Sequence, residues 1–154
     1  MLHKNAIKGL LLSITFLLAA CGGDGSDADT NPTGPFNLTF SLDASFQVPH
    51  GDQAIRIAVI RLSDGIVVAE GSGMVSATQN PTFSFAAGAV MELGNSYAVH
   101  YWIDSNIDGG TSGLCDPKEI DHQWSVEFLS PSNDVNFTVS YEPTLTEDVC
   151  STFI

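Results

Sequence analysis

Basic residues are scarce in this chain of 154 residues, which has five lysines and arginines against 18 aspartates and glutamates. Its formal net charge at pH 7 is −13. A field of that sign repels nucleic acids and anionic lipid headgroups, because their phosphates are negative as well. The composition therefore argues against nucleic acid as a partner. It leaves two interpretations of the acidity, which are attraction of cations and basic partners, or solubility alone.

Apolar runs long enough to cross a membrane are lacking too. The uncharged run at residues 9–18 has about ten residues, whereas a membrane-spanning helix needs roughly 20. It follows Lys4 and Lys8 and leads into the small residues of LAAC at positions 18–21. A charged start, a short apolar run and a small-residue end are typical of a signal peptide that is removed on export. The sequence therefore predicts a signal peptide at residues 1–20.

The LAAC tetrapeptide resembles the lipobox of bacterial lipoproteins. This resemblance implies cleavage before Cys21 and acylation of that cysteine, where an ordinary secretory peptide is the alternative. Two or more acyl chains make a stable anchor, because each buried methylene contributes about 0.8 kcal/mol. In that family an aspartate directly after the cysteine often signals retention in the inner membrane, and here the residue is Gly22. The resemblance therefore implies a lipid-anchored envelope protein, in the outer rather than the inner membrane.

Large apolar residues are missing from positions 22–35, which read GGDGSDADTNPTGP. Such a segment buries too little surface to offset the entropy of ordering it, so residues 21–35 are predicted to be the lipidated cysteine and a flexible linker. The folded domain is predicted at residues 36–154, and one core is expected. Removal of the leader leaves three basic residues against 18 acidic ones, a net charge of −15.

Cysteines number only three, and with Cys21 acylated a single pair is left, Cys115 and Cys150. Disulfides persist outside the cytoplasm, so this pair is predicted to be bridged. Closing a loop of that length contributes about 4 kcal/mol in the chain-entropy treatment. A metal-thiolate or redox role is disfavoured, because it usually needs a second cysteine close in sequence.

Helical periodicity is absent after the leader, and short alternating or β-branched runs are separated by clusters of Gly, Pro, Asn and Asp instead. Seven strands in about 120 residues predict an all-β, antiparallel two-sheet β-sandwich of the immunoglobulin-like or transthyretin-like kind, with a small barrel as the alternative. The strands are predicted at residues 36–42, 54–62, 65–71, 82–88, 96–103, 123–129 and 134–141.

The order of the strands also predicts which loops share an end, because antiparallel neighbours reverse direction each time. The loops before the second strand, between the third and fourth, and between the fifth and sixth are expected at the same end. This brings His50 and Asp52 toward Asp104, Asp121 and His122, although they are distant in sequence.

The loop after the fifth strand begins with DSNIDG, which matches the start of an EF-hand calcium loop. Such loops place oxygen ligands at alternate positions and Gly at the sixth for a sharp turn. Position twelve is Cys115 instead of a carboxylate, so we expect a calcium loop between strands rather than an EF-hand. A turn without metal is the alternative, because Asn, Asp and Gly favour turns for conformational reasons. The expected ligands are Asp104, Asn106, Asp108 and the Gly110 carbonyl, with Asp116, Glu119 or Asp121 as the closing carboxylate.

The DHQW segment at residues 121–124 suggests a second kind of site. Asp121 could orient the His122 imidazole, whose other nitrogen would then join His50 in binding copper or zinc. The alternative is structural: a histidine that caps the loop, followed by Trp124 in the core. His100 is predicted to be a half-buried sheet residue.

The joint pattern FQVPHGDQ … YAVHYWIDSNIDGG … CDPKEIDHQW resembles a group of uncharacterised exported bacterial β-sandwich domains. Their pattern is F-x-x-H near the start, then Y-x-V, D-x-N-x-D-G and D-H-x-W. In this chain Phe46 and His50 stand one residue further apart than in that pattern. The resemblance covers roughly residues 46–124 and brings no established activity. It implies the fold and the coupling of His50 with His122.

Hydrolase motifs such as G-x-S-x-G are absent, and about 120 residues leave little room for a deep glycosidase cleft. We therefore expect a membrane-anchored, non-catalytic binding or interaction module with a calcium-stabilised loop. The alternative is a periplasmic or surface protein that binds copper or zinc through His50 and His122. A structural role with an envelope partner is a third expectation.

Overall fold

The computed structural model describes residues 34–128 and 130–154. The predicted signal peptide, the lipidation of Cys21 and most of the predicted linker fall on residues 1–33 and lie outside the described residues. No helix in the described part of the chain is long and apolar enough to cross a membrane.

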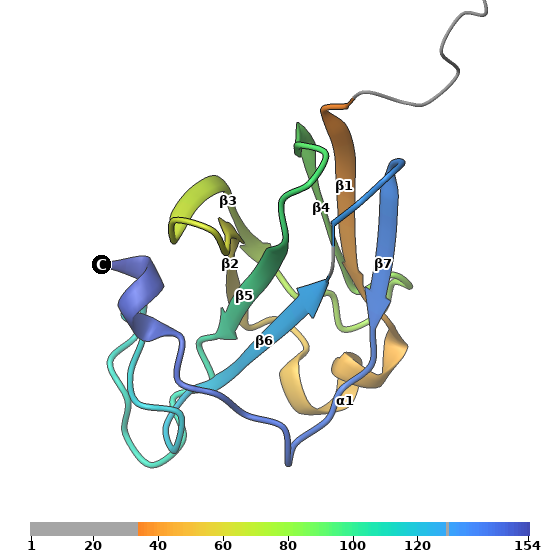
Figure 1. Ribbon diagram of the computed structural model, residues 1–154. Coiled ribbons are helices and arrows are strands. Elements are labelled where there is room, and N and C mark those ends of the chain that lie inside the picture. Colours follow the sequence, from red (N-terminus) through yellow and green to blue (C-terminus); the bar gives the residue numbers. More distant parts are fainter. Residues whose placement is uncertain (1–33, 129) are drawn as a thin grey trace, which may run out of the picture. The chain divides into compact units, whose positions relative to one another are not determined.

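The described chain is an all-β sandwich, as predicted (Figure 1). One sheet has the strand order β4-β1-β7, and the other has the order β3-β2-β5-β6. All neighbouring strands are antiparallel except β1 and β7, which run parallel. The strands are β1 (Phe36–Leu42), β2 (Ala54–Arg61), β3 (Ile66–Met74), β4 (Phe83–Met91), β5 (Tyr97–Ile103), β6 (His122–Phe128) and β7 (Val135–Val139).

Short helical turns occupy the connection before β2, where the sequence predicted a loop, and the C-terminal tail. A 3-10 turn, η1 (Ala44–Phe46), and a single helical turn, α1 (Gln47–His50), join β1 to β2. A second 3-10 turn, η2 (Cys150–Phe153), lies near the C-terminus. The Asp43 carboxylate accepts a hydrogen bond from Ser45 N at 2.9 Å, which caps the start of η1.

The core lies between the two sheets and follows the predicted alternation along the strands. Ile55, Ile57 and Val59 of β2 point into it and are at most 1% exposed. Ala58 and Ile60 on the other face of β2 are buried as well, and β2 is a central strand with β3 and β5 on either side.

Strands β3 and β4 extend to Met74 and Met91, beyond the predicted ends at residues 71 and 88. Glycine made this stretch of β3 look like a loop, but here glycine makes room for aromatic rings. A Cβ atom on Gly71 would lie 2.5 Å from the Phe85 ring, and one on Gly73 would lie 2.8 Å from the Phe83 ring. The missing side chains therefore allow the rings of β4 to pack on β3.

Candidate functional site

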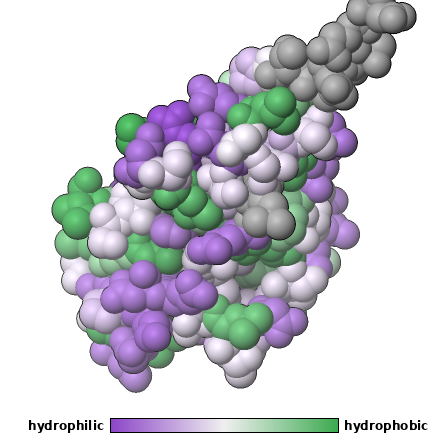
Figure 2. Space-filling model, viewed as in Figure 1, coloured by the Kyte–Doolittle hydropathy of each residue, from purple (hydrophilic) through white to green (hydrophobic). Residues whose placement is uncertain are grey.

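Three connections meet at one end of the sandwich, as the strand order predicted. Asp104 N at the start of the β5–β6 loop donates to Ala54 O at 2.9 Å, and Val75 N after β3 donates to Gln53 O at 2.9 Å. This end is opposite the one where β1 begins (Figure 1). Mainly hydrophilic side chains cover the corner at which the β5–β6 loop lies (Figure 2).

Two histidines from separate connections pair at this end. His50 is the last residue of α1, and His122 is the first residue of β6. Their ring nitrogens, His50 Nε2 and His122 Nδ1, are 3.1 Å apart. Nδ1 of His50 lies 2.7 Å from Gln53 Oε1, which can only accept, so His50 donates there. His50 Nε2 is then the acceptor, and His122 donates from Nδ1.

Aromatic side chains enclose the histidine pair. The His50 ring centroid lies 6.0 Å from that of Phe46, 6.0 Å from Trp124 and 5.0 Å from Tyr141. His50 is 1% exposed, whereas His122 is half-buried. As predicted, Trp124 fills the core and is 3% exposed.

The nonpolar surroundings keep both imidazoles neutral at pH 7. Burial lowers the pKa of His50 to about 4, against an opposing effect of the Gln53 hydrogen bond, and repulsion from His122 lowers it further. Burial also lowers the pKa of His122, and the nearby Asp121 carboxylate opposes this. A neutral imidazole has a lone pair for a metal ion or a proton.

Asp121 holds the β5–β6 loop together from inside. It is fully buried, and Oδ1 accepts from Ser105 N at 3.0 Å and Asn106 N at 3.1 Å. Oδ2 accepts from Asp116 N at 3.0 Å. Burial raises the pKa of this carboxyl, and the three backbone hydrogen bonds oppose that rise. The described contacts of Asp121 therefore organise the loop, and the hydrogen-bond partner of the His122 ring is His50.

Asp121→Asn is expected to destabilise the protein by about 2 kcal/mol, because one amide nitrogen would then face a backbone N–H donor. Urea denaturation at pH 7 measures the change. Asp108→Asn is the matched control, because this exposed carboxylate lies in the same loop and loses the same charge. Equal stabilities of the two variants would contradict the structural role of Asp121.

Oxygen atoms converge around Gly110 in the same loop. A Cβ atom on Gly110 would lie 3.0 Å from both Asn106 Oδ1 and Asp116 Oδ2, and it would overlap the Ile120 Cγ2 methyl group. Asn106 Nδ2 donates to Asp104 Oδ1, and Gly113 N donates to Asp104 Oδ2 at 2.7 Å. Asn106 Oδ1 is buried and has no hydrogen-bond partner among the described residues. An unpaired buried oxygen is costly, and a bound water molecule or a cation would satisfy it.

The backbone conformation of the loop explains why two positions of the D-x-N-x-D-G motif are Asn and Asp. Asn106 has φ 47° and Asp108 has φ 55°, in the left-handed region that Asn and Asp tolerate better than other side chains. The Asp108 side chain is exposed, as are those of Glu119 and Asp52. Of the predicted calcium ligands, the structure thus brings together the side chains of Asp104, Asn106 and Asp116, beside Gly110.

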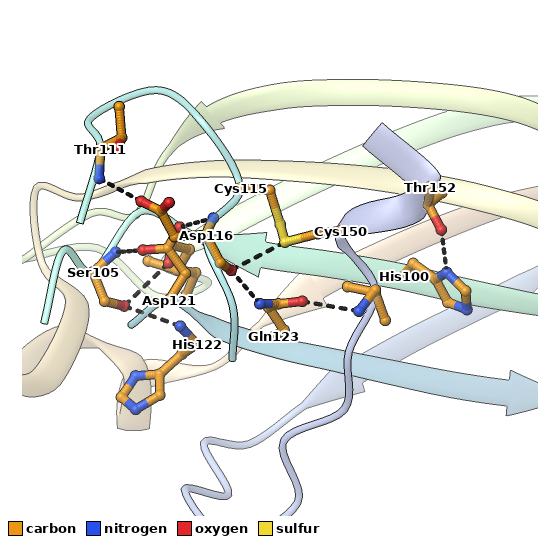
Figure 3. The surroundings of a disulfide bond; sticks show 12 residues. His100, Ser105, Thr111, Cys115, Asp116, Asp121, His122, Gln123, Cys150 and Thr152 are labelled. Atoms are coloured by element: carbon orange, nitrogen blue, oxygen red, sulfur yellow. Dashed lines mark hydrogen bonds between the residues drawn. A yellow bond between two sulfur atoms is a disulfide. The ribbon is translucent and has the colours of Figure 1, made fainter. Parts of the chain in front are cut away.

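The predicted disulfide, Cys115–Cys150, is present and pins the C-terminal tail to this loop (Figure 3). Beside it, the buried Gln123 joins the same two segments. Gln123 Nε2 donates to Asp116 O at 2.6 Å, and Gln123 Oε1 accepts from Val149 N at 2.8 Å. The tail then covers the outer face of the sheet, where Thr152 Oγ1 lies 2.8 Å from the ring nitrogen Nδ1 of the half-buried His100.

Sequence reasoning did not find the roles of Gln53 and Gln123. Glutamine carries no motif, although the alternation in DHQW does place Gln123 on the face of β6 opposite His122. Within residues 34–128 and 130–154, no group of three or more His, Cys, Asp or Glu side chains is placed to hold a metal ion. A metal at this end would therefore use amide, backbone or solvent ligands as well.

No protein-family model, curated protein or solved structure matches this chain. The resemblances to bacterial lipoproteins and to exported β-sandwich domains therefore stay predictions.

Proposed function

We propose that this protein is a lipid-anchored, non-catalytic binding module of the cell envelope, with a β5–β6 loop stabilised by Ca²⁺. The outer membrane is the proposed location, with acylated Cys21 as the anchor. The predicted linker leads to β1, which begins at the end of the sandwich opposite the three loops.

The observation that carries the calcium proposal is the buried, unpartnered Asn106 Oδ1. It lies close to Gly110, as does Asp116 Oδ2, which accepts a hydrogen bond from Thr111 N. Ca²⁺ prefers carboxylate, amide and carbonyl oxygens, which are the donors gathered here. Asp104, Asn106 and Asp116 would hold the ion, which would give the unpartnered Asn106 Oδ1 a positively charged partner.

Calcium titration of the mature chain tests this proposal. Binding is expected with a dissociation constant on the order of 10⁻⁴ to 10⁻³ M, as for other extracellular sites. At ten times that concentration, Ca²⁺ should stabilise the fold by about 1.4 kcal/mol. Isothermal titration measures the binding, and the melting temperature measures the stabilisation. The absence of both a binding heat and a shift in melting temperature at 10 mM Ca²⁺ would contradict the proposal.

Two variants of the same loop locate the ion. Asp116→Asn should weaken Ca²⁺ binding at least fivefold, because it removes one of the converging carboxylates. Glu119→Gln removes an equal charge from an exposed side chain and should leave the affinity within twofold. Equal losses in both variants would indicate general electrostatic attraction and contradict a formed site.

A second candidate function is the binding of copper or zinc by the histidine pair. The 3.1 Å between His50 Nε2 and His122 Nδ1 suits two ligands of a tetrahedral ion, whose metal–nitrogen bonds are about 2.0–2.1 Å. The metal ion would take the place of the proton on His122 Nδ1. The neutral His122 ring would then carry its proton on Nε2 instead. Imidazole nitrogens suit Zn²⁺ or Cu²⁺ better than Ca²⁺, which prefers oxygen ligands.

Metal titration of the wild type and of His122→Ala tests this second function. Zn²⁺ or Cu²⁺ binding should fall at least tenfold in His122→Ala, because only His50 remains. His100→Ala is the control. The half-buried His100 of β5 lies on the outer face of the sheet, where its ring contacts Thr152. Equal binding by the wild type and His122→Ala would contradict this function.

Anchoring is tested on protein purified from its native envelope. Mass spectrometry should find a chain that begins at Cys21 and carries acyl chains, and Cys21→Ser should abolish the acylated form. A chain with an unmodified Cys21 would contradict the proposed anchor and the outer-membrane location.

A further inference from the structure

A slot opens along the seam where the edge strands β6 and β7 of the two sheets face each other. It has a volume of about 290 Å³, close to the lower end of the usual range for small-molecule sites. It is lined by Tyr101, Trp124, Ser125, Val126, Val139, Ser140, Glu142 and Leu145.

Two aromatic rings form the inner wall of this slot. The rings of Tyr101 and Trp124 stack at 18° with their centroids 5.1 Å apart, and they are 2% and 3% exposed. Trp124 Nε1 donates to Glu142 O at 3.1 Å, which holds the indole in place. Burial raises the pKa of the Tyr101 phenol, which therefore stays protonated at pH 7. A phenol hydroxyl can both donate a hydrogen bond to a ligand and accept one from it.

The charged residues around the slot determine whether it favours a positive or a negative ligand. Its lining includes the exposed Glu142 and no lysine or arginine, and the whole domain is acidic. An anion would be repelled, whereas a protonated nitrogen would be attracted both to Glu142 and to the surrounding field. The half-buried Val126 and Val139 and the exposed Leu145 offer apolar contact to the rest of the ligand.

We propose that the β6–β7 slot binds a small amphipathic amine, with its apolar body against Tyr101, Trp124 and Val139 and its ammonium group near Glu142. This inference rests on the proposed role as a binding module, but on neither of the two metal sites. The slot shares Trp124 with the aromatic surroundings of the histidine pair, since the Trp124 and His122 ring centroids are 5.6 Å apart. A ligand in the slot therefore also contacts a side chain of the candidate metal site.

Isothermal titration of the full chain in lipid nanodiscs, with empty nanodiscs subtracted, tests the slot with three matched probes. Tyramine carries an ammonium group, tyrosol a hydroxyl in its place, and 4-hydroxyphenylacetate a carboxylate. Tyramine should bind saturably and at least fivefold more tightly than tyrosol, and 4-hydroxyphenylacetate should not bind. The absence of saturable tyramine binding up to 10 mM, or equal binding of all three probes, would overturn the proposal.

Variants then test whether tyramine binds in the slot. Glu142→Gln should weaken tyramine at least fivefold and leave tyrosol unchanged, whereas Glu127→Gln, an exposed charge outside the lining, should change neither by more than twofold. Val139→Phe fills the slot and should abolish binding of both probes. Leu145→Ala, at a 65% exposed position where folding is not at risk, should weaken both. Tyramine binding that persists in Val139→Phe and Leu145→Ala would overturn the proposal.

Failure of the slot and failure of the calcium proposal give different results. If tyramine does not bind but Ca²⁺ still raises the melting temperature, the slot inference is wrong and the calcium-stabilised module stands. If tyramine binds in the predicted pattern without any calcium effect, the slot stands and the metal part of the function is wrong.

Discussion

Reduction of the Cys115–Cys150 disulfide lowers the free energy of unfolding by about 4 kcal/mol and the melting temperature by roughly 15 °C. The two cysteines are 35 residues apart in sequence, and the bridge removes many extended conformations from the unfolded chain. The folded state keeps its other contacts with the tail, which include both hydrogen bonds of the Gln123 amide. The loss should therefore appear as reduced stability of a protein that still folds.

Urea denaturation with and without a reductant measures this effect. The double variant Cys115→Ser, Cys150→Ser should match the reduced wild type, and the reductant should leave that variant unchanged. A difference below 1 kcal/mol between oxidised and reduced protein would contradict the prediction, because the tail would then be held by its noncovalent contacts alone.

Acidification from pH 6.5 to pH 4 costs about 3 kcal/mol of stability through His50. A histidine in the unfolded chain has a pKa near 6.5, whereas burial lowers the pKa of folded His50 to about 4. Between these values the unfolded chain binds a proton that the folded chain does not. The contribution is therefore complete above pH 6.5 and is lost as the pH falls, at about 1.4 kcal/mol for each unit of pKa difference.

Other titratable groups also contribute to the pH dependence of stability, each with a sign set by its own pKa shift. The pKa of His122 is lowered as well, so its effect has the same sign. The pKa of Asp121 is raised by burial, so its protonation on acidification opposes the loss. The lowered pKa values of Asp43 and Asp134 act at lower pH, below the ordinary value of a carboxyl group.

Denaturation curves measured from pH 4 to pH 8 test the role of His50. His50→Phe keeps an aromatic ring in the cluster and should remove most of the slope between pH 6.5 and 4. Burial lowers the pKa of His100 as well, against the opposing effect of Glu147 and Glu127, so His100→Gln should remove only a smaller part of the slope. An unchanged slope in His50→Phe would contradict the assignment.

Several features of this domain follow from the sequence alone, because each depends on local pattern or on counting. Alternation and turn residues predicted the seven strands, and the number of cysteines predicted the disulfide. The reversal of successive antiparallel strands predicted that His50 and His122 would meet. None of these steps needs the angle between the sheets or the path of a loop.

The tertiary structure alone decided what the individual side chains do. The D-x-N-x-D-G motif does not reveal that Asp121 accepts three loop N–H groups, or that Asn106 Oδ1 is left unpaired. The slot beside Trp124 depends on how far β6 and β7 stand apart at the seam. Hydrogen-bond partners and cavities arise from distances between segments remote in sequence, and a difference of one ångström decides them, whereas hydrophobic periodicity records only which face of each strand is buried.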